Sequence, residues 1–322
     1  MALAAPSAAR WPTVQPGRGH YESFYLRAVH PTQPRGVWIR YTVTMPAGGE
    51  PYGQLWFTYF DRDAPRPVAV RVDAGEAATG SEAWIRLGDS TFGPSEVVGR
   101  AASAGGSVAW SLRAGSGEPP LQHLPRDWMY RARLPRTKLL TLSPATVFDG
   151  TLEVDGETVD VAGWPGMVGH NWGEEHAARW IWLHGLAFDD HGADTWLDVA
   201  VGRITVGPVT TPWVANGALS LDGERLALGG LGRRVTVVAD DDHCVLRLPG
   251  KGVTVTATAA APADAFVEWD YANPDGSMHR VVNCSVADLT VRVERRGREP
   301  VELTGPHRAA YELGREDDAA PA

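Results

Sequence analysis

The sequence contains few cysteines and no cysteine motif. Only Cys244 and Cys284 occur in 322 residues, and neither belongs to a C-x-x-C pair. A dense disulfide framework is therefore excluded. The spacing leaves open whether the two thiols are free or joined in one disulfide. Such sparing use of cysteine is typical of the reducing cytoplasm, which is the expected location.

Positive charge is also scarce. The formal net charge is −9 at pH 7, and we read the Lys and Arg residues as spread along the chain without a block. Such a surface repels phosphate backbones and anionic lipid head groups, so no nucleic-acid partner is expected. The opening MALAAPSAAR has neither a basic n-region nor a sustained apolar stretch. We therefore expect no signal peptide and no stable membrane anchor.

Helical periodicity is nearly absent, whereas strand-like patterns recur along the chain. Segments such as GVWIRYTVTMP, GQLWFTYFD and KGVTVTATAA alternate in polarity or are rich in β-branched and aromatic residues, which is typical of strands. The Asp-Gly pairs in FDGTLEVDGE and SLDGERLAL supply the positive φ angles that tight hairpins need. The pattern predicts an all-β protein of antiparallel sandwiches or barrels.

Length and one break in the strand rhythm indicate two domains. The Gly- and Pro-rich stretch GRITVGPVTTPWVANGALSLDG interrupts the alternation near residues 202–223, as linkers often do. We place an N-terminal domain at 1–205 and a C-terminal domain at 206–315. The acidic, alanine-rich tail at 316–322 is expected to be disordered.

The faces of three predicted strands place aromatic rings beside isolated polar groups. If RWIWLHGLAF is extended, one face carries two tryptophans and a histidine, and the other face is also apolar. Both faces of this strand are therefore expected to be covered by other parts of the protein. A buried Arg40 needs a partner, for which Glu22 is the candidate. These faces form either an aromatic-lined ligand cavity or a filled core, and the pattern leaves both open. The predicted substrate-binding residues are Glu22, Trp38, Arg40, Trp56, Trp180, Trp182 and His184.

Several familiar site motifs are missing from the sequence. There is no G-x-G-x-x-G after a strand, no G-x-x-x-x-G-K-[ST] and no G-x-S-x-G, so nucleotide-binding and serine-hydrolase functions have no support. His170, Glu174, His176 and His184 do not match a standard zinc spacing, and no metal site is predicted.

The stretch GMVGHNWG is predicted to be a special loop. Glycines at 166, 169 and 173 bracket His170 and Asn171, and Trp172 is expected to anchor the loop by packing. His170 is either a ligand-contacting group or a structural histidine. The following EEHAAR, with Glu174, Glu175 and His176, is expected to be solvated.

The order of these features resembles a known superfamily. The carrying residues are ESFYL (22–26), VWIRYT (37–42), LWFTYFD (55–61), GHNWG (169–173) followed by WIW (180–182), and NCSVADL (283–289). They resemble the two-domain lipocalin-like superfamily of carotenoid 1,2-hydratases (hydroxyneurosporene synthases), tocopherol cyclases, AttH-like proteins and fungal Diels–Alderases. The H-N-W-G stretch followed by W-x-W is the most specific element.

The resemblance implies two lipocalin-like β-barrel domains that hold an apolar ligand and act on it without a nucleotide or redox cofactor. Hydratase-type members carry an acidic residue just before the histidine, where this chain has Gly169. Protonating an alkene needs a positioned acid. Glu174 or Glu175, or Glu22 and Asp198 from neighbouring strands, are the candidates to replace it.

Two functions follow from the resemblance and from the residues together. In the first, the protein is an enzyme that binds an isoprenoid- or polyketide-like molecule and promotes hydration, cyclisation or a pericyclic step, with His170, Asn171 and Glu174 as the predicted catalytic residues. In the second, it is a lipocalin-like carrier that sequesters such a molecule. The sequence favours the enzyme because a polar, glycine-fixed segment precedes the aromatic strand.

Overall fold

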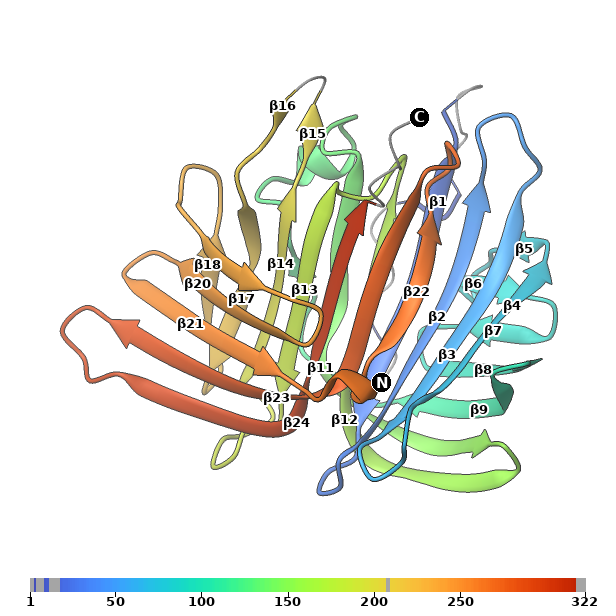
Figure 1. The fold of residues 1–322 in the computed structure, drawn as a ribbon, viewed down its shortest axis with the longest axis horizontal. Coiled ribbons are helices and arrows are strands. Elements are labelled where there is room, and N and C mark those ends of the chain that lie inside the picture. The colour runs from blue at the N-terminus through green and yellow to red at the C-terminus, as the bar shows by residue number, and fades with distance from the viewer. Residues whose placement is uncertain (1–2, 4–8, 12–17, 207–208, 317–322) are drawn as a thin grey trace.

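The chain folds into two large antiparallel sheets that lie side by side (Figure 1). The structure, a computed structural model, describes residues 3, 9–11, 18–206 and 209–316. These residues contain no α-helix and only two short 3-10 helices, Asp127–Tyr130 and Ala263–Ala265. No helix among them is long and apolar enough to cross a membrane. The predicted all-β fold is confirmed.

The first sheet has 12 strands and curls into a nearly closed barrel. Its order is β4-β3-β2-β1-β12-β11-β9-β8-β7-β6-β5, and β10 pairs with β11. The strands are β1 (His20–Val29), β2 (Arg35–Met45), β3 (Tyr52–Asp61), β4 (Val68–Gly75), β5 (Ala77–Ala78), β6 (Ile85–Leu87), β7 (Ser90–Phe92), β8 (Glu96–Ser103), β9 (Gly106–Ala114), β10 (Leu121–Gln122), β11 (Thr137–Val154) and β12 (Glu157–Gly173).

The second sheet has 10 strands and forms a curled half-barrel. Its order is β18-β17-β14-β13-β24-β23-β21-β20-β19, with β22 paired to β23. A separate hairpin joins β15 (Thr205–Val206) to β16 (Val209–Thr210). The strands are β13 (Arg179–Leu186), β14 (Trp196–Arg203), β17 (Val214–Leu221), β18 (Glu224–Gly229), β19 (Thr236–Ala239), β20 (His243–Pro249), β21 (Val253–Ala260), β22 (Val267–Ala272), β23 (Met278–Arg295) and β24 (Val301–Glu316).

Local sequence accounts for many of these strands and turns. In β9, Val108, Trp110 and Leu112 are buried while their neighbours point outward, as period-two alternation requires. The hairpin between β11 and β12 turns at Asp155-Gly156, where φ is 51° and 87°. Both residues lie in the left-handed region that a tight hairpin needs, so the predicted Asp-Gly turn is confirmed there.

The change of sheet falls earlier than the predicted domain boundary. β12, the last strand of the first sheet, ends at Gly173, and β13, the first strand of the second sheet, begins at Arg179, whereas the sequence placed the boundary at 205/206. The W-x-W strand therefore pairs with β24, near the end of the chain. Local composition does not reveal which strand, so distant in the sequence, will pair with this one. The predicted tail falls on residues 317–322, outside the described part, and on Glu316, which ends β24.

The two cysteines are buried and free. Cys244 lies in β20 and Cys284 in β23, and no disulfide joins them. Burial raises the pKa of each thiol to about 12. Both side chains therefore act as small apolar groups of the second core.

β1 is buried on both faces and forms the shared wall between the sheets. Phe24 and Leu26 point into the barrel core, whereas Tyr25 and Arg27 point toward the second sheet. The Arg27 guanidinium is fully buried and donates to His184 Nδ1 at 2.9 Å, to the Ser285 carbonyl at 2.8 Å and to the Arg308 carbonyl at 3.2 Å. Among the described residues no carboxylate forms an ion pair with it. Three elements of the second sheet are thus held by one buried cation.

Replacing Arg27 tests this junction. Arg27→Met keeps an apolar stem but leaves buried acceptors of His184, Ser285 and Arg308 without their donor, and each such loss costs about 1–3 kcal/mol. We expect the free energy of unfolding to fall by about 3 kcal/mol or more in urea titration. Arg113→Met, which changes an exposed arginine of β9, should stay within about 0.5 kcal/mol of the parent. Equal stabilities of the two variants would contradict the proposed junction.

Candidate functional site

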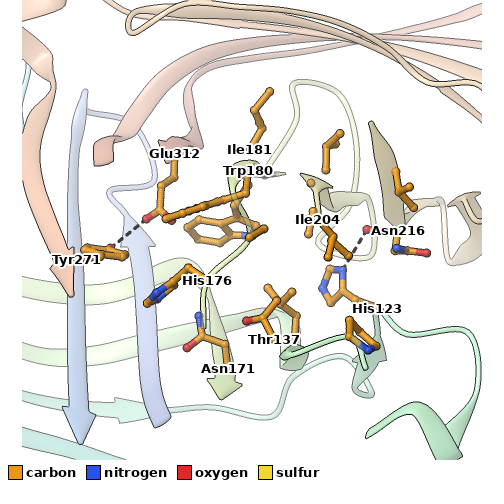
Figure 2. A pocket seen from close by; sticks show the side chains of 18 of the residues that line it. His123, Thr137, Asn171, His176, Trp180, Ile181, Ile204, Asn216, Tyr271 and Glu312 are labelled. Carbon is orange, nitrogen blue, oxygen red and sulfur yellow. Dashed lines mark hydrogen bonds between the residues drawn. The ribbon is translucent and has the colours of Figure 1, made fainter. Parts of the chain in front are cut away.

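A cavity of about 130 Å³ lies between the two sheets (Figure 2). One wall comes from β1, β2, β11 and β12, and the other from β13, β14, β17, β22 and β24. Its base is buried and largely aromatic, which is typical of small-molecule sites. The residues that line it with rings or polar groups are Tyr21, Tyr25, Trp38, Arg40, His123, Thr137, Asn171, His176, Trp180, Trp182, Asn216, Tyr271 and Glu312.

Stacked rings form one end of the cavity. The ring of His176 lies 4.2 Å from that of Tyr21 with planes 16° apart, and 5.4 Å from that of Trp180 with planes 21° apart. Trp180 in turn stacks on Tyr271 at 6.2 Å. Trp180 can lie across β24 because Gly314 has no side chain; a Cβ there would come within 2.1 Å of the indole. This end is therefore apolar and fixed in shape.

His176 presents an unpaired nitrogen atom. Its Nδ1 lies 2.7 Å from Asn273 Oδ1, and that oxygen also accepts the His176 backbone N–H at 2.8 Å. Nδ1 is therefore the protonated nitrogen and Nε2 carries the lone pair. Nε2 is buried and has no hydrogen-bond partner among the described residues. Burial, together with the charge of Arg40, lowers the pKa of His176 to about 3, so the ring is neutral and acts as an acceptor.

Arg40 brings a positive charge to the same end. Its guanidinium lies over the Tyr271 ring, 4.3 Å from the centroid, and the residue is only 4% exposed. Within the described chain it forms no ion pair, and its Nε lacks a hydrogen-bond partner. The predicted pairing with Glu22 is wrong, because Glu22 points into the barrel while Arg40 lies on the outer face of the sheet. A buried cation without a counterion favours an electron-rich group beside it.

The cavity carboxylate, Glu312, is already engaged by neutral donors. Trp180 Nε1 donates to Oε1 at 2.9 Å, and Tyr271 Oη and Asn283 Nδ2 donate to Oε2 at 3.2 Å each. These bonds hold the two aromatic side chains in place. Glu312 is therefore a positioning residue for the stacked end rather than a free acid.

A second polar chain lies at the opposite end. His123 Nδ1 donates to the Asn216 carbonyl at 3.1 Å, and His123 Nε2 lies 3.0 Å from Thr141 Oγ1, which donates to Asp198 Oδ2 at 2.5 Å. Burial works against charge on both groups, but their mutual attraction outweighs it. The pKa of His123 is raised, and that of Asp198 is lowered to about 2. His123 is thus a buried histidine of the cavity whose Nε2 lies 3.6 Å from the Asp198 carboxylate.

Five predicted site residues line the cavity, and one borders a narrow extension. Trp180 and Trp182 share the cavity-facing side of β13, as alternation predicted. Trp56 lines a small extension beside Arg40 and Tyr271, where its Nε1 donates to Thr42 Oγ1 at 2.7 Å. The five that line the main cavity are Trp38, Arg40, Asn171, Trp180 and Trp182.

The predicted GHNWG loop is part of a regular strand. β12 continues to Gly173 and pairs with β1 and β11 through this stretch. Alternation therefore turns Asn171 toward the cavity and His170 into the barrel. His170 is fully buried between Phe24, at 4.2 Å, and Trp172, at 4.4 Å. It does not line the cavity.

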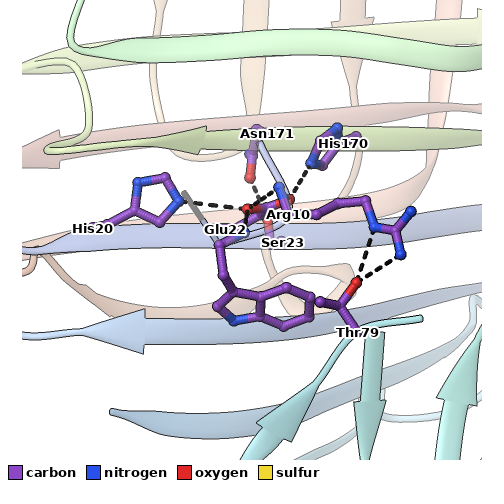
Figure 3. A network of polar contacts seen from close by, with 8 residues as sticks. Arg10, His20, Glu22, Ser23, Thr79, His170 and Asn171 are labelled. Atoms are coloured by element: carbon purple, nitrogen blue, oxygen red, sulfur yellow. Dashed lines mark hydrogen bonds and ion pairs between the residues drawn. The ribbon is translucent and has the colours of Figure 1, made fainter. Parts of the chain in front are cut away.

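Glu22 and His170 belong to a network inside the barrel (Figure 3). His170 Nε2 donates to Glu22 Oε1 at 2.8 Å, and the backbone N–H groups of Arg10 and Trp11 donate to the same carboxylate at 2.6–2.8 Å. Burial opposes the charge, but these bonds and His20 lower the pKa of Glu22 to about 2. Glu22 therefore anchors residues 10–11 to the barrel and lies outside the cavity.

Two further predicted residues also lie elsewhere. Glu174 is half-buried, 3.7 Å from Arg18. His184 continues the Trp180–Trp182 face but reaches the junction beyond the cavity, where its Nε2 donates to the Pro144 carbonyl at 2.8 Å. Burial and the charge of Arg27 lower the pKa of His184 to about 4, so it acts there as a neutral acceptor.

The sequence did not identify several cavity residues. His176 was expected to be solvated, although it directly precedes the W-x-W strand that carries its stacking partner. Tyr271 and Glu312 lie on β22 and β24, whose VEWDYA and AAYELG segments were not among the strands expected from the sequence. His123 had no recognisable signal. All four are brought together by pairing over long sequence distances.

Gly169 shows why this chain has no acid before His170. It pairs directly with Tyr25 on β1, and a Cβ at 169 would lie 2.2 Å from Tyr25 Cζ. The phenol ring occupies the space that a side chain at this position would take. An acid at 169 and a tyrosine at 25 are therefore sterically incompatible in this arrangement.

Comparisons with known proteins place the fold. No family model matches the sequence. Two uncharacterised proteins from strains of Mycobacterium tuberculosis, MT0513 and Rv0493c, are each 28% identical over 311 residues, covering 94% of this chain and 89% of theirs.

Two solved structures share its architecture. CghA with Sch210972 has a TM-score of 0.62 at 13% identity, covering 98% of this chain and 94% of that one. Kievitone hydratase from Nectria haematococca has a TM-score of 0.54 at 10% identity, covering 94% and 91%. The chain has the two-domain lipocalin-like fold. The predicted structural resemblance is thereby confirmed, and at these identities it concerns the fold alone.

The Glu22 network predicts an acid-sensitive fold. Because the folded-state pKa of about 2 lies below the ordinary 4.5, the carboxylate stabilises the fold above about pH 5, and this contribution of about 3 kcal/mol is lost as the pH falls toward 2. Glu22→Gln should lower the free energy of unfolding by a similar amount at neutral pH and flatten its dependence on acid pH in urea titrations. Glu76→Gln, at an exposed position, should reproduce the parent curve; a parent-like curve for Glu22→Gln would contradict the anchor.

A double-mutant cycle tests the contact between Gly169 and Tyr25. Gly169→Ala should cost about 1–3 kcal/mol of stability through overpacking against the phenol. In a Tyr25→Ala background the same change should cost much less, because the obstructing ring is gone. Gly202→Ala is the matched control, since a Cβ there meets only ordinary contacts at 3.7 Å or more. Equal costs in both backgrounds would refute the steric explanation.

Proposed function

We propose that the protein is an enzyme that holds an apolar small molecule with an oxygen function between its two sheets and promotes hydration, cyclisation or a pericyclic step without a cofactor. The observation that carries the proposal is that, at one end of an aromatic cavity, a buried guanidinium without a carboxylate partner among the described residues lies near an imidazole nitrogen without a hydrogen-bond partner. The fold shared with kievitone hydratase and CghA supports it as an analogy.

The aromatic walls select the body of the ligand. Trp38, Tyr25, Trp180 and Trp182 contribute ring surface to the cavity lining, and the indole N–H groups of the last two are engaged by carboxylates. Tyr25 and Trp182 contact each other edge to face at 5.5 Å, and such an aromatic wall favours flat or unsaturated carbon skeletons packed against it. Burial of such a skeleton supplies binding energy and fixes its conformation, which is the main requirement of a cyclisation or pericyclic step.

The polar end orients the reacting group. Arg40 would donate to a carbonyl or enolate oxygen and stabilise negative charge that develops on it. His176 Nε2 would accept a hydrogen bond from a water molecule or a ligand hydroxyl. In a hydration, this water's oxygen would bond to the β-carbon of a conjugated carbonyl as the C=C π electrons shift toward the oxygen that Arg40 holds. The proton that the water loses would pass to His176 Nε2 and from there to the α-carbon. In a pericyclic step, Arg40 would polarise the same carbonyl.

His123 is assigned no proton-donating role, because both of its ring nitrogens are engaged by the protein. Nδ1 bonds to the Asn216 carbonyl and Nε2 to Thr141 Oγ1, which in turn donates to Asp198. This chain of bonds fixes the end of the cavity opposite Arg40 and His176. Of the three predicted catalytic residues, Asn171 is the one that remains in the cavity.

One observation favours the second candidate function, a non-catalytic carrier. Both carboxylates near the cavity, Glu312 and Asp198, are fully engaged by protein donors. A carrier needs the cavity and Arg40 but no proton transfer. Native mass spectrometry of protein purified from its own host, followed by incubation of the bound compound, separates the two: an enzyme changes its mass or chromatographic retention, and a carrier returns it unchanged.

Two dyes of nearly equal shape test the polar end. 1-Anilinonaphthalene-8-sulfonate carries an anionic group, and N-phenyl-1-naphthylamine is its neutral analogue. Arg40→Met should weaken binding of the sulfonate about tenfold or more, the value of one charge-assisted contact, and should leave the neutral dye nearly unaffected. Fluorescence titration measures both affinities.

Arg71→Met is the matched control, because Arg71 lies over the outer Trp56 ring at 4.8 Å without lining the cavity. His176→Phe keeps a ring in the stack but removes the acceptor, so neutral-dye binding should persist while turnover of the co-purified compound is lost. Equal weakening of both dyes by Arg40→Met would refute the oxygen-directed site.

A further inference from the structure

A basic and aromatic segment lies at the rim of the cavity. Between β10 and β11 the chain reads RDWMYRARLPR, residues 126–136. Trp128 is 63% exposed and Leu134 is 47% exposed. Among the large apolar side chains that the described part of the chain leaves exposed, Trp128 is the one aromatic. Two large apolar side chains exposed in one short segment at a cavity rim mark a candidate interaction surface, which a single exposed residue would not.

The segment is held in place by its own tyrosine. Tyr130 Oη donates to the Leu139 carbonyl at 2.8 Å and accepts the Leu124 backbone N–H at 3.2 Å. Its ring packs against Trp172 at 5.8 Å. Because Tyr130 is fixed toward the barrel, the short 3-10 helix Asp127–Tyr130 presents Trp128 outward.

Both ends of this segment border the cavity. Leu124 precedes it and Pro135 lies within it, and both line the cavity, as do Ile204 and Val214 at the base of the β15–β16 hairpin. In Figure 1 the green coil of the segment lies beside that hairpin, which carries another exposed apolar side chain, Val209, at 63%. Exposed apolar groups therefore flank two sides of the same rim.

The charge of the segment is opposite to that of the whole protein. Arg126, Arg131 and Arg133 are exposed, and in the described ranges none of them forms an ion pair. Asp127 is the single acidic residue between 126 and 136, whereas the chain as a whole carries −9. The net charge of the whole sequence did not reveal this basic segment, because its arginines are separated by one to four other residues and form no continuous block.

We propose that segment 126–136 docks on the surface of an anionic phospholipid bilayer, with Trp128 and Leu134 in the head-group region and the three arginines on lipid phosphates. Amphipathic aromatic side chains favour this interface, and each nearby basic residue adds to the attraction. Docking in this way turns the cavity rim toward the lipid. Insofar as the ligand is apolar, which rests on the proposed function, it would pass from bilayer to cavity without crossing water.

Charge complementarity favours this partner over two others. A second copy of the chain docked through the same patch would place like charges opposite each other. A nucleic acid could meet the arginines but would leave the exposed apolar side chain of Leu134 in water, whereas a bilayer surface accepts both. Binding to either one in place of vesicles would overturn the proposal.

Vesicle sedimentation of the full chain without any added ligand tests the docking. We expect binding to phosphatidylcholine vesicles that contain phosphatidylglycerol, weak binding to phosphatidylcholine alone, and loss of binding as salt is raised. Arg131→Ser with Arg133→Ser should weaken binding about thirtyfold, at about 1 kcal/mol per charge. Trp128→Ala should weaken it about tenfold.

Leu231→Ala is the matched control, because Leu231 is 77% exposed in the turn after β18 and does not line the cavity; it should bind like the parent. The dye affinities of Trp128→Ala should be unchanged, so failure of docking and failure of the cavity are distinguishable. No binding to anionic vesicles, or binding that the arginine and tryptophan changes leave intact, would refute the inference.

Discussion

Burial of β1 on both faces is the constraint on which the rest of the structure depends. Its inner face completes the barrel core, and its outer face meets the second sheet. A strand in this position cannot carry an exposed polar face, so each polar side chain on it needs a dedicated partner. Glu22 satisfies this with His170 and two backbone N–H groups, and Arg27 with acceptors of the second sheet. The sheets are therefore joined by desolvated polar contacts as well as by apolar packing.

The same alternation decides which residues reach the cavity. On β12, one step along the chain separates His170, enclosed in the barrel, from Asn171, which faces the second sheet. On β1, one step separates Phe24 in the barrel core from Tyr25 in the cavity. A cavity between two sheets is thus lined by every second residue of several strands. Its chemistry depends on which side chains those strands place at the same height along the cavity.

Local sequence patterns predicted what depends on neighbouring residues. The Asp155-Gly156 turn, the strands and the shared face of Trp180 and Trp182 follow from φ preferences and period-two alternation. The surroundings of His170 and His176 did not follow from these patterns. The strand that carries His170 is flanked by glycines and therefore resembles a loop. A buried histidine in a loop, such as His176, has the same local sequence as a solvated one. Both depend on partners far away in sequence, Glu22 and Asn273. Long-range pairing is what a single sequence leaves unspecified.

The contact between Tyr25 and Gly169 bears on the chemistry that the cavity can support. A carboxyl group at 169 would act as a proton donor to an unactivated double bond, since burial among rings would keep it protonated. Tyr25 takes that space with a phenol whose pKa burial raises well above its usual value, and such a group does not protonate alkenes. What the cavity provides instead is a fixed cation, Arg40, and a neutral acceptor, His176. Under the proposed function these two groups would act on an oxygen atom of the ligand. A ring in place of an acid at this point therefore supports the proposal of a substrate that a carbonyl group already activates, rather than one that needs alkene protonation.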